Sequence, residues 1–312
     1  MKNKSQHITV LLNETIENLK IKKNGIYIDG TFGCGGHTNK ILNKLNEYGR
    51  IFVIDKDPKA IEIAKRIKDH RIKVIHGSFA MILKYAIKFN IIKKIDGIIL
   101  DLGMSSMQIA DKNRGFSFLR NSYLDMRMNN TKGITAAEWL QKSSEKEISQ
   151  VLKKLGEERY AKKIAKAIVK KNKISPIKYT KELVEIIKKS TPKKYQNKNP
   201  ATRSFQAIRI FINNELSDIK IALKDSLKIL KNKGRILTIS FHSLEDRIIK
   251  HFMINNSKQI NLPKDIPLTK IQLDKINPKI LKIIGRIFPS KNEIQNNIRA
   301  RSAILRVAEL NK

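Results

Sequence analysis

A glycine-dense loop is the first stretch of the sequence whose residue types could bind a ligand. Residues 25–37 read GIYIDGTFGCGGH, so a short run of β-forming residues leads through an acid into closely spaced glycines and a helix-like segment. Glycine lets the backbone turn sharply and lie close to a ligand because it has no Cβ. The order strand, glycine loop, helix is typical of the first unit of a doubly wound nucleotide-binding sheet.

A carboxylate follows the next apolar stretch at the spacing of a ribose-binding acid. Asp55 ends RIFVID (50–55), roughly 20 residues beyond the loop, where a carboxylate can accept hydrogen bonds from both ribose hydroxyls. The loop lacks the G-x-G-x-x-G spacing of a pyrophosphate site, and the sequence has no G-K-[ST] phosphate loop. The pattern is compatible with S-adenosylmethionine, which carries no phosphate, with Phe79 near the adenine. The alternatives are an ordinary turn with a strand-end acid and a Phe79 buried in the core.

A second group of polar residues begins where a later strand is expected to end. Asp101 closes the apolar run 97–102, and Ser105 and Ser106 follow it closely. Ligands of open α/β sheets bind at this edge of the sheet. Acceptors there could hold the hydrogens of an exocyclic aryl amine and take up its developing positive charge, which would make this poor nucleophile reactive. The alternative is a turn and helix cap without chemistry.

The single cysteine and the six histidines narrow the possible chemistry. Methylation of a pyrimidine carbon usually requires a cysteine nucleophile at the base, and Cys34 lies in the cofactor loop instead, which favours methylation of a nitrogen. The histidines show no metal-ligand spacing, so no metal site is expected. One cysteine allows no internal disulfide, which suits a reducing cytoplasm.

The elements that must position these residues alternate between strands and helices. The pattern predicts a parallel α/β sheet, with strands at 26–29, 50–55, 73–76 and 97–102 and helices at 37–47, 58–69 and 79–89. Residues 103–130 read as a loop. The stretch 135–190 reads as all-helical, with Thr135 and Ser144 as helix caps. A helix over 202–230 and strands at 235–241 and 303–308 complete the pattern.

These patterns predict three segments. Residues 1–131 form the first part of an α/β core, 132–198 form a helical insertion, and 199–312 form the second part of the core, with a polar, weakly periodic and flexible stretch at 255–298.

Basic residues and a histidine near the expected sheet edge could contact a nucleic acid. Arg203 lies at a helix start, which suits a phosphate or a base edge, and the alternative is a solvated arginine on a capped helix. His242 follows the strand at 235–241, so it should face the same edge as Asp101, unless it is a structural histidine. Arg299 and Arg301 precede the last strand and suit an RNA backbone. Ser-His-Asp hydrolysis is disfavoured, because adjacency in sequence is not triad geometry.

The charge of the chain favours a polyanionic partner. The 312 residues include 64 Lys and Arg against 28 Asp and Glu, which gives a formal charge of +36. Nucleic acid is the leading candidate, because counterions are released when basic side chains meet phosphates. A lysine-rich coding bias explains part of the same excess. No apolar run is long enough for a signal peptide or a membrane span, so a soluble, cytoplasmic protein is expected.

Ten motifs together resemble the ribosomal RNA small subunit methyltransferase H family over nearly the whole chain. The blocks DGTFGCGGH and SFHSLEDR are the most specific. The full ordered set is HITVLL, YIDGTFGCGGH, VIDKDPKAI, GIILDLGMSSMQ, RGFSF, LDMRM, GEERYAKKIAKAI, NPATRSFQAIRI, ISFHSLEDRIIK and RARSAILRVAE.

The resemblance implies a class I, Rossmann-like methyltransferase core interrupted by a helical domain. It implies methyl transfer from S-adenosyl-L-methionine to the N4 amine of a cytidine in the decoding centre of 16S ribosomal RNA, in an assembled or nearly assembled small subunit. Asn199 and Ile298 depart from the family pattern, which often has His and Pro there. The cofactor contacts carried over by the resemblance are Gly35, Gly36, His37, Asp55, Phe79, Asp101 and Gln108.

Two other functions are compatible with such a core. A DNA or small-molecule methyltransferase would act on free DNA or metabolites, although the large basic insertion argues against a small substrate. A non-enzymatic assembly factor would bind the subunit without catalysis, although the intact glycine loop, Asp55 and Asp101 argue against it.

Overall fold

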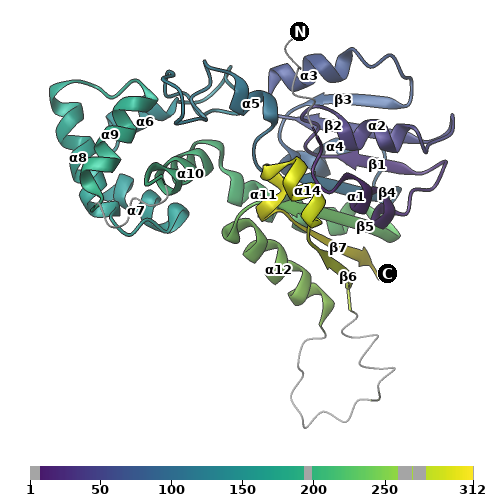
Figure 1. Ribbon diagram of the computed structural model, residues 1–312. Coiled ribbons are helices and arrows are strands. Elements are labelled where there is room, and N and C mark those ends of the chain that lie inside the picture. The colour runs from purple at the N-terminus through teal and green to yellow at the C-terminus, as the bar shows by residue number, and fades with distance from the viewer. Residues whose placement is uncertain (1–7, 193–198, 259–268, 270–278, 312) are drawn as a thin grey trace. The chain divides into compact units, whose positions relative to one another are not determined.

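Two units, each with its own hydrophobic core, make up the chain. One comprises Met1–Gly103 and Leu216–Lys312, and the other comprises Met104–Glu215. The computed structural model describes residues 8–192, 199–258, 269 and 279–311 (Figure 1). The helical stretch expected at 132–198 lies inside the second unit, and its residues 193–198 lie outside the described part.

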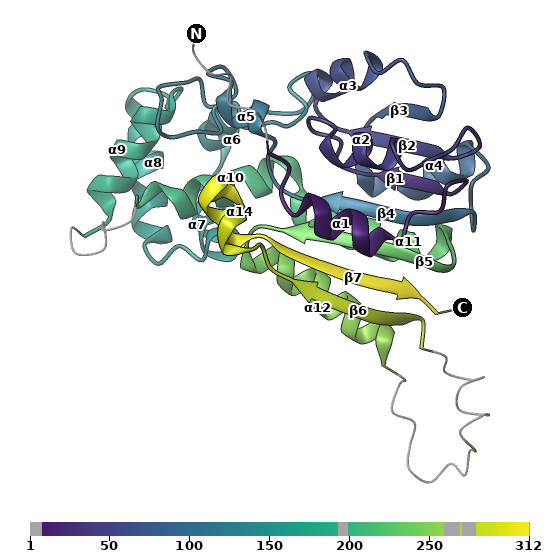
Figure 2. The ribbon, with the colours of Figure 1, turned by 45° about the vertical axis from the view of Figure 1, so that its right-hand side comes forward.

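The first unit is built on a seven-stranded sheet in the order β3-β2-β1-β4-β5-β7-β6 (Figure 2). Five neighbouring strands, β3 to β5, are parallel, and β7 is antiparallel to both of its neighbours. The carboxyl ends of the parallel strands and the amino end of β7 therefore lie at one edge of the sheet, called the carboxyl edge below. The strands are β1 Ile26–Asp29, β2 Arg50–Asp55, β3 Ile72–His76, β4 Ile95–Asp101, β5 Leu230–Ser240, β6 Leu281–Ile287 and β7 Ile304–Leu310.

Helices cover both faces of this sheet, as the continuous apolar strands require (Figure 1). On one face α4, α11 and α12 pack over Ile98 and Leu100 of β4, both fully buried. The α/β class predicted from the sequence is confirmed. The helices of this unit are α1 Leu12–Leu19, α2 Gly36–Leu42, α3 Pro58–Lys65, the 3-10 helix η1 Phe79–Met81, α4 Ile82–Lys88, α11 Glu215–Ile229, α12 Ser243–Ser257, α14 Lys291–Asn296 and the 3-10 helix η3 Ile298–Ser302.

The second unit is helical. Thr135 and Ser144 cap α6 and α7 as predicted, each in a capping box with a glutamate at the third helical position. No described helix in either unit has the length and apolar character needed to cross a bilayer. The helices of this unit are α5 Ser106–Ala110, α6 Ala136–Lys142, α7 Glu145–Gly156, α8 Ala161–Ile174, α9 Thr180–Ser190 and α10 Ala201–Asn213.

Three segments of the chain differ from the sequence-based expectation. The stretch 255–298 was expected to be polar and flexible, but it contains β6 and α14 in its described part. β6 is an edge strand with exposed Lys282 and Arg286, so its alternation is weak, and pairing with the distant β7 defines it. Helix α5 lies in the expected loop 103–130. The helix expected over 202–230 is interrupted at Asn214, whose φ of 54° is left-handed.

The central strand of the sheet provides a test of the core. Replacing Ile98, which is fully buried, with alanine should cost about 2–5 kcal/mol of unfolding free energy, because a methyl-lined cavity remains. The matched change Ile87→Ala, at a side chain 60% exposed, should cost about 0.5 kcal/mol or less. Urea denaturation followed by circular dichroism measures both. Equal midpoints for the two variants would contradict the observed packing.

Candidate active site

The glycine loop between β1 and α2 has the geometry of a ligand-binding turn. Gly33 and Gly35 have φ of 55° and 80°, a left-handed conformation that side chains with a Cβ rarely adopt. Gly36 begins α2, and a Cβ there would collide with the side chain of Thr9. The loop is thus held between the N-terminal segment and the sheet, with its backbone at the carboxyl edge.

Asp29, the last residue of β1, fixes both ends of this loop. Its side chain is 1% exposed. Oδ1 accepts a hydrogen bond from the Thr31 backbone N–H at 3.2 Å, and Oδ2 accepts one from the Thr38 hydroxyl at 2.7 Å. Burial raises the pKa of this carboxyl. No role in the site is predicted for Asp29 from the sequence, although its position at a strand end before glycines is a signal that could have identified it.

Asp55, at the end of β2, closes the loop from the other side. Its Oδ2 accepts the Gly33 N–H at 2.8 Å, and its Oδ1 accepts the Asp57 N–H at 2.8 Å. An ionised carboxylate has about four acceptor sites, so further donors can still bind. Burial raises the pKa of Asp55 to about 6, because these two N–H bonds offset desolvation only in part. The group is ionised above that pH and suits the predicted contact with ribose hydroxyls.

Asp101 ends β4 and carries an unsatisfied oxygen. Its backbone N–H donates to the Thr31 hydroxyl at 2.6 Å, and its Oδ2 lies 3.9 Å from Nδ1 of His37. Its Oδ1 is buried and has no hydrogen-bond partner in the described part of the chain. Burial, and then the charges of Asp29 and Glu245, raise its pKa well above the ordinary value. A buried carboxylate oxygen without a partner is costly, so this position is suited to a donor or cation from a ligand.

The loop after β3, which carries Phe79, is held by an ion-pair network. Ser78 caps η1 through the Ala80 N–H, and its hydroxyl donates to Oδ2 of Asp218 at 2.8 Å. Lys56, next to Asp55, places its Nζ 2.6 Å from the same oxygen. Phe79 is half-buried, and a Cβ on Gly30 would contact it. Asp218 on α11 therefore connects the loops after β2 and β3. The sequence alone does not predict this role, because it joins distant segments.

His242 lies at the carboxyl edge in a capping arrangement. Its Nδ1 accepts the Glu245 N–H at 3.4 Å, while Oε2 of Glu245 accepts the Phe241 N–H at 2.9 Å. Its Nε2 lies 3.1 Å from Oε1 of Glu245. Arg299 and Arg301 are exposed on η3, immediately before β7, whose Ile304 pairs with the end of β5. These three residues therefore share the edge with Asp101, and their predicted substrate contacts stay predictions.

The other predicted site residues belong to the second unit. Ser105 and Gln108 form a reciprocal capping box on α5, with the Ser105 N–H donating to Oε1 of Gln108 at 3.0 Å. Ser106 is the first residue of that helix. Arg203 is exposed and donates to the Glu157 carbonyl at 3.3 Å. The local geometry gives Ser105 and Gln108 helix-capping roles, and their predicted amine and cofactor contacts stay predictions. The expectation of no metal also stays a prediction.

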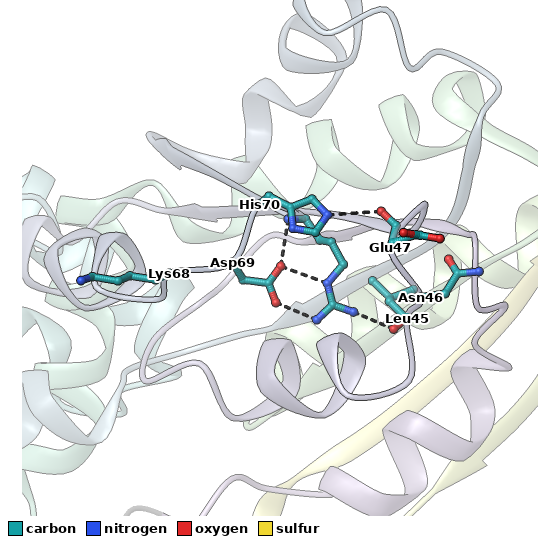
Figure 3. A pocket seen from close by; sticks show the side chains of 7 residues that line it. Leu45, Asn46, Glu47, Lys68, Asp69 and His70 are labelled. Carbon is teal, nitrogen blue, oxygen red and sulfur yellow. Dashed lines mark hydrogen bonds and ion pairs between the residues drawn. The ribbon is translucent and has the colours of Figure 1, made fainter.

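A hollow beside the amino end of β3 has a different character (Figure 3). Arg71 donates to both carboxylate oxygens of Asp69, at 2.9 and 2.6 Å, and to the Leu45 carbonyl at 2.6 Å. The hydrogen bonds from Arg71 lower the pKa of Asp69 to about 2. The guanidinium of Arg71 already donates hydrogen bonds to these groups of the protein. We therefore interpret this cluster as a structural connection between the loop after α2 and the start of β3.

Comparison with known proteins decides the family. The model of the MraW methylase family matches residues 4–311. The chain belongs to the MraW methylase family. Two relatives are each called ribosomal RNA small subunit methyltransferase H. The one from Buchnera aphidicola subsp. Cinara cedri is 56% identical over 97% of this chain and 99% of its own length. The one from Wigglesworthia glossinidia brevipalpis is 55% identical over 97% and 98%.

Membership confirms the resemblance noted in the sequence, and it confirms that the chain is a methyltransferase with S-adenosyl-L-methionine as methyl donor. A solved rRNA methylase from Streptococcus thermophilus aligns with 98% of this chain and 99% of that one at 10% identity and a TM-score of 0.44. In the present chain the residues at the carboxyl edge fit such a donor. Asp101 offers an unsatisfied acceptor there, and Asp55 accepts two backbone N–H bonds and has acceptor capacity left.

The raised pKa of Asp55 predicts a pH-dependent affinity for the methyl donor. The carboxylate must be ionised to accept two hydroxyl hydrogens, so the affinity should fall by up to about tenfold per pH unit below pH 6 and stay level from 6.5 to 7. Isothermal titration calorimetry with S-adenosyl-L-methionine between pH 5 and 7 measures it. Asp55→Asn should bind weakly at every pH and lose this dependence. That loss would assign the pH dependence to Asp55 rather than to Asp101, whose pKa is also raised. An unchanged affinity from pH 7 to 5 would refute the role.

The Asp218 network predicts a positioning effect on the same affinity. Asp218→Ala removes the partner of Lys56 and Ser78, so donor affinity should fall about three- to tenfold. The matched control is Asp225→Ala on the same helix, which breaks an ion pair with Lys228 and should leave affinity unchanged. Calorimetry together with thermal melting separates a loss of binding from a loss of folding. Equal affinities in the two variants would contradict the positioning role.

Proposed function

We propose that this methylase transfers a methyl group from S-adenosyl-L-methionine to the N4 amine of a cytidine in the decoding centre of 16S ribosomal RNA. The observation that carries the proposal is the group of Asp55, Asp101 and the glycine loop at one sheet edge, with an unsatisfied oxygen on Asp101. The small-subunit RNA as substrate class is supported by the name of relatives that match along nearly their whole length.

In this proposal some residues at the sheet edge bind the methyl donor and others contact the substrate amine. Gly35, Gly36 and His37, with Asp55 and Phe79, hold the donor: the loop backbone approaches its amino-acid part, Asp55 takes the ribose hydroxyls, and Phe79 lies by the adenine. Gln108 and Asp101 are the remaining predicted donor contacts. The bound donor supplies an electrophilic methyl group on a sulfonium.

In the same proposal Asp101 accepts a hydrogen bond from the N4 amine of the cytosine. The N4 lone pair of cytosine is delocalised into the ring, so an acceptor that holds its hydrogens improves its overlap with the methyl carbon. The unsatisfied Oδ1 of Asp101 is suited to be that acceptor. The raised pKa of Asp101 enables the carboxylate to take a proton from the amine after methyl transfer. Ser105 and Ser106 are further acceptors in the sequence-based prediction. The target base has to leave its stack to reach this edge.

The RNA itself is held by basic parts of the chain in this proposal. The insertion at 132–198 is the substrate domain between the two core segments 1–131 and 199–312. Arg203, His242, Arg299 and Arg301 are the proposed substrate contacts, and three of these are exposed. The proposed substrate is the assembled or nearly assembled small subunit, because a decoding-centre cytidine reaches its final conformation there.

Mass mapping of methylated nucleosides tests this function. Small-subunit RNA from cells that lack the protein is compared with RNA from the same cells carrying the wild type, Asp55→Ala or Asp101→Asn. We expect one N4-methylated cytidine to disappear without the protein and to return with the wild type. With Asp101→Asn the rate of its methylation should stay below about one hundredth of the wild-type rate, because removal of a stabilising group lowers the rate by about 10²–10³. An unchanged cytidine map without the protein would refute the proposal.

A further inference from the structure

Helix α8 of the second unit presents lysines on one exposed face. Its opposite face is buried in the core of that unit through Ala161, Ile164, Ala165 and Ile168, all at most 3% exposed. This burial fixes the rotation of the helix about its axis. The exposed lysines, called the α8 stripe below, are Lys162, Lys163, Lys166, Lys170 and Lys173.

The spacing of the stripe follows the helix geometry. At about 100° per residue, Lys162, Lys166, Lys170 and Lys173 fall within a sector of about 80°, and Lys163 lies at its border. The rise of about 1.5 Å per residue places successive members about 5 to 6 Å apart and gives the stripe a length of about 16 Å. The lysines thus form a row of positive charges along a rigid element.

The charges of the stripe have no compensation within the described part of the chain. Helix α8 contains no Asp or Glu, whereas the neighbouring α7 and α9 carry glutamates in their first turns. None of the five stripe lysines makes an ion pair or a hydrogen bond with another described residue. A lysine-rich coding bias alone predicts exposed lysines, but it does not predict that they gather on the acid-free helix.

This placement destabilises the isolated helix. Lys162 and Lys166, and Lys166 and Lys170, are like-charge pairs at i,i+4, which repel each other. Lys162 and Lys163 also lie in the first turn, where the helix dipole disfavours cations. A polyanion bound along this face would offset both costs.

We propose that the α8 stripe binds consecutive backbone phosphates of the RNA substrate. Lysine is a compact point charge with no preferred base edge, so the stripe supplies affinity and orientation rather than sequence specificity. The identity of the RNA as small-subunit ribosomal RNA rests on the proposed function, whereas the phosphate contact itself is independent of which nucleoside is methylated.

Salt-dependent binding tests the stripe. The variant is Lys162→Gln/Lys166→Gln/Lys170→Gln, because glutamine keeps the side-chain length roughly and favours helix. Affinity for 16S ribosomal RNA and for isolated small subunits is measured by fluorescence anisotropy at several KCl concentrations. The slope of log affinity against log salt should fall in magnitude by about 2 to 3, since each lost phosphate contact contributes about 0.7 to 0.9.

The matched control is Lys20→Gln/Lys23→Gln/Lys44→Gln, three exposed lysines in the first unit, in the segments that flank the amino ends of the strands. It removes the same charge and should leave the salt slope unchanged. Both variants should bind S-adenosyl-L-methionine as the wild type does. Neither should melt at a lower temperature than the wild type, because the stripe variant removes like-charge repulsion. An unchanged slope in the stripe variant, or an equal change in the control, would overturn the inference. A changed slope with no loss of N4-methylcytidine in cells lacking the protein would refute the proposed function and leave the stripe intact.

Discussion

The burial of three carboxylates at one sheet edge is the constraint that shapes the first unit. Asp55, Asp29 and Asp101 end the adjacent strands β2, β1 and β4, and burial raises the pKa of each. Like charges in a poorly solvated place are unfavourable unless donors surround them. The glycine loop provides one such donor, because Gly33 in its left-handed conformation donates its backbone N–H to Asp55, while the hydroxyl of Thr38 in the following helix donates to Asp29. The loop and the carboxylates therefore require each other.

The three carboxylates differ in how fully hydrogen bonds offset the cost of their burial, and this difference indicates where a ligand binds. Asp29 is satisfied by Thr31 and Thr38, so it acts as a structural anchor. Asp55 keeps acceptor capacity beyond its two N–H bonds. Asp101 retains a buried oxygen without a partner among the described residues, which leaves the site incomplete without a ligand. A folded protein tolerates such a destabilising group where ligand binding compensates for it. We therefore expect the methyl donor and the substrate amine at this end of β4.

The second unit contains a buried ion pair, whereas many of its lysines are exposed. Arg209 donates two hydrogen bonds, at 2.9 and 2.8 Å, to Glu215, the last residue of this unit and the first of α11. Asn213 donates one to the Met126 carbonyl. By contrast, the lysines of the α8 stripe lack partners in the described part of the chain. The ions that stabilise the fold are thus separated from those available to a polyanion, and only the latter respond strongly to salt.

The sequence by itself determined the alternation of strands and helices, the glycine loop, Asp55 and the caps of α6 and α7, because each depends on residues close together in the chain. It also specified the family, through motifs that are short and specific. It did not reveal β6, whose edge position weakens its alternation, or the break at Asn214. Only the tertiary structure decided that Asp29 anchors the loop, that Asp218 joins the loops after β2 and β3, and that Asp101 keeps an unsatisfied oxygen. These properties arise from contacts between distant segments and from burial, which local pattern does not encode.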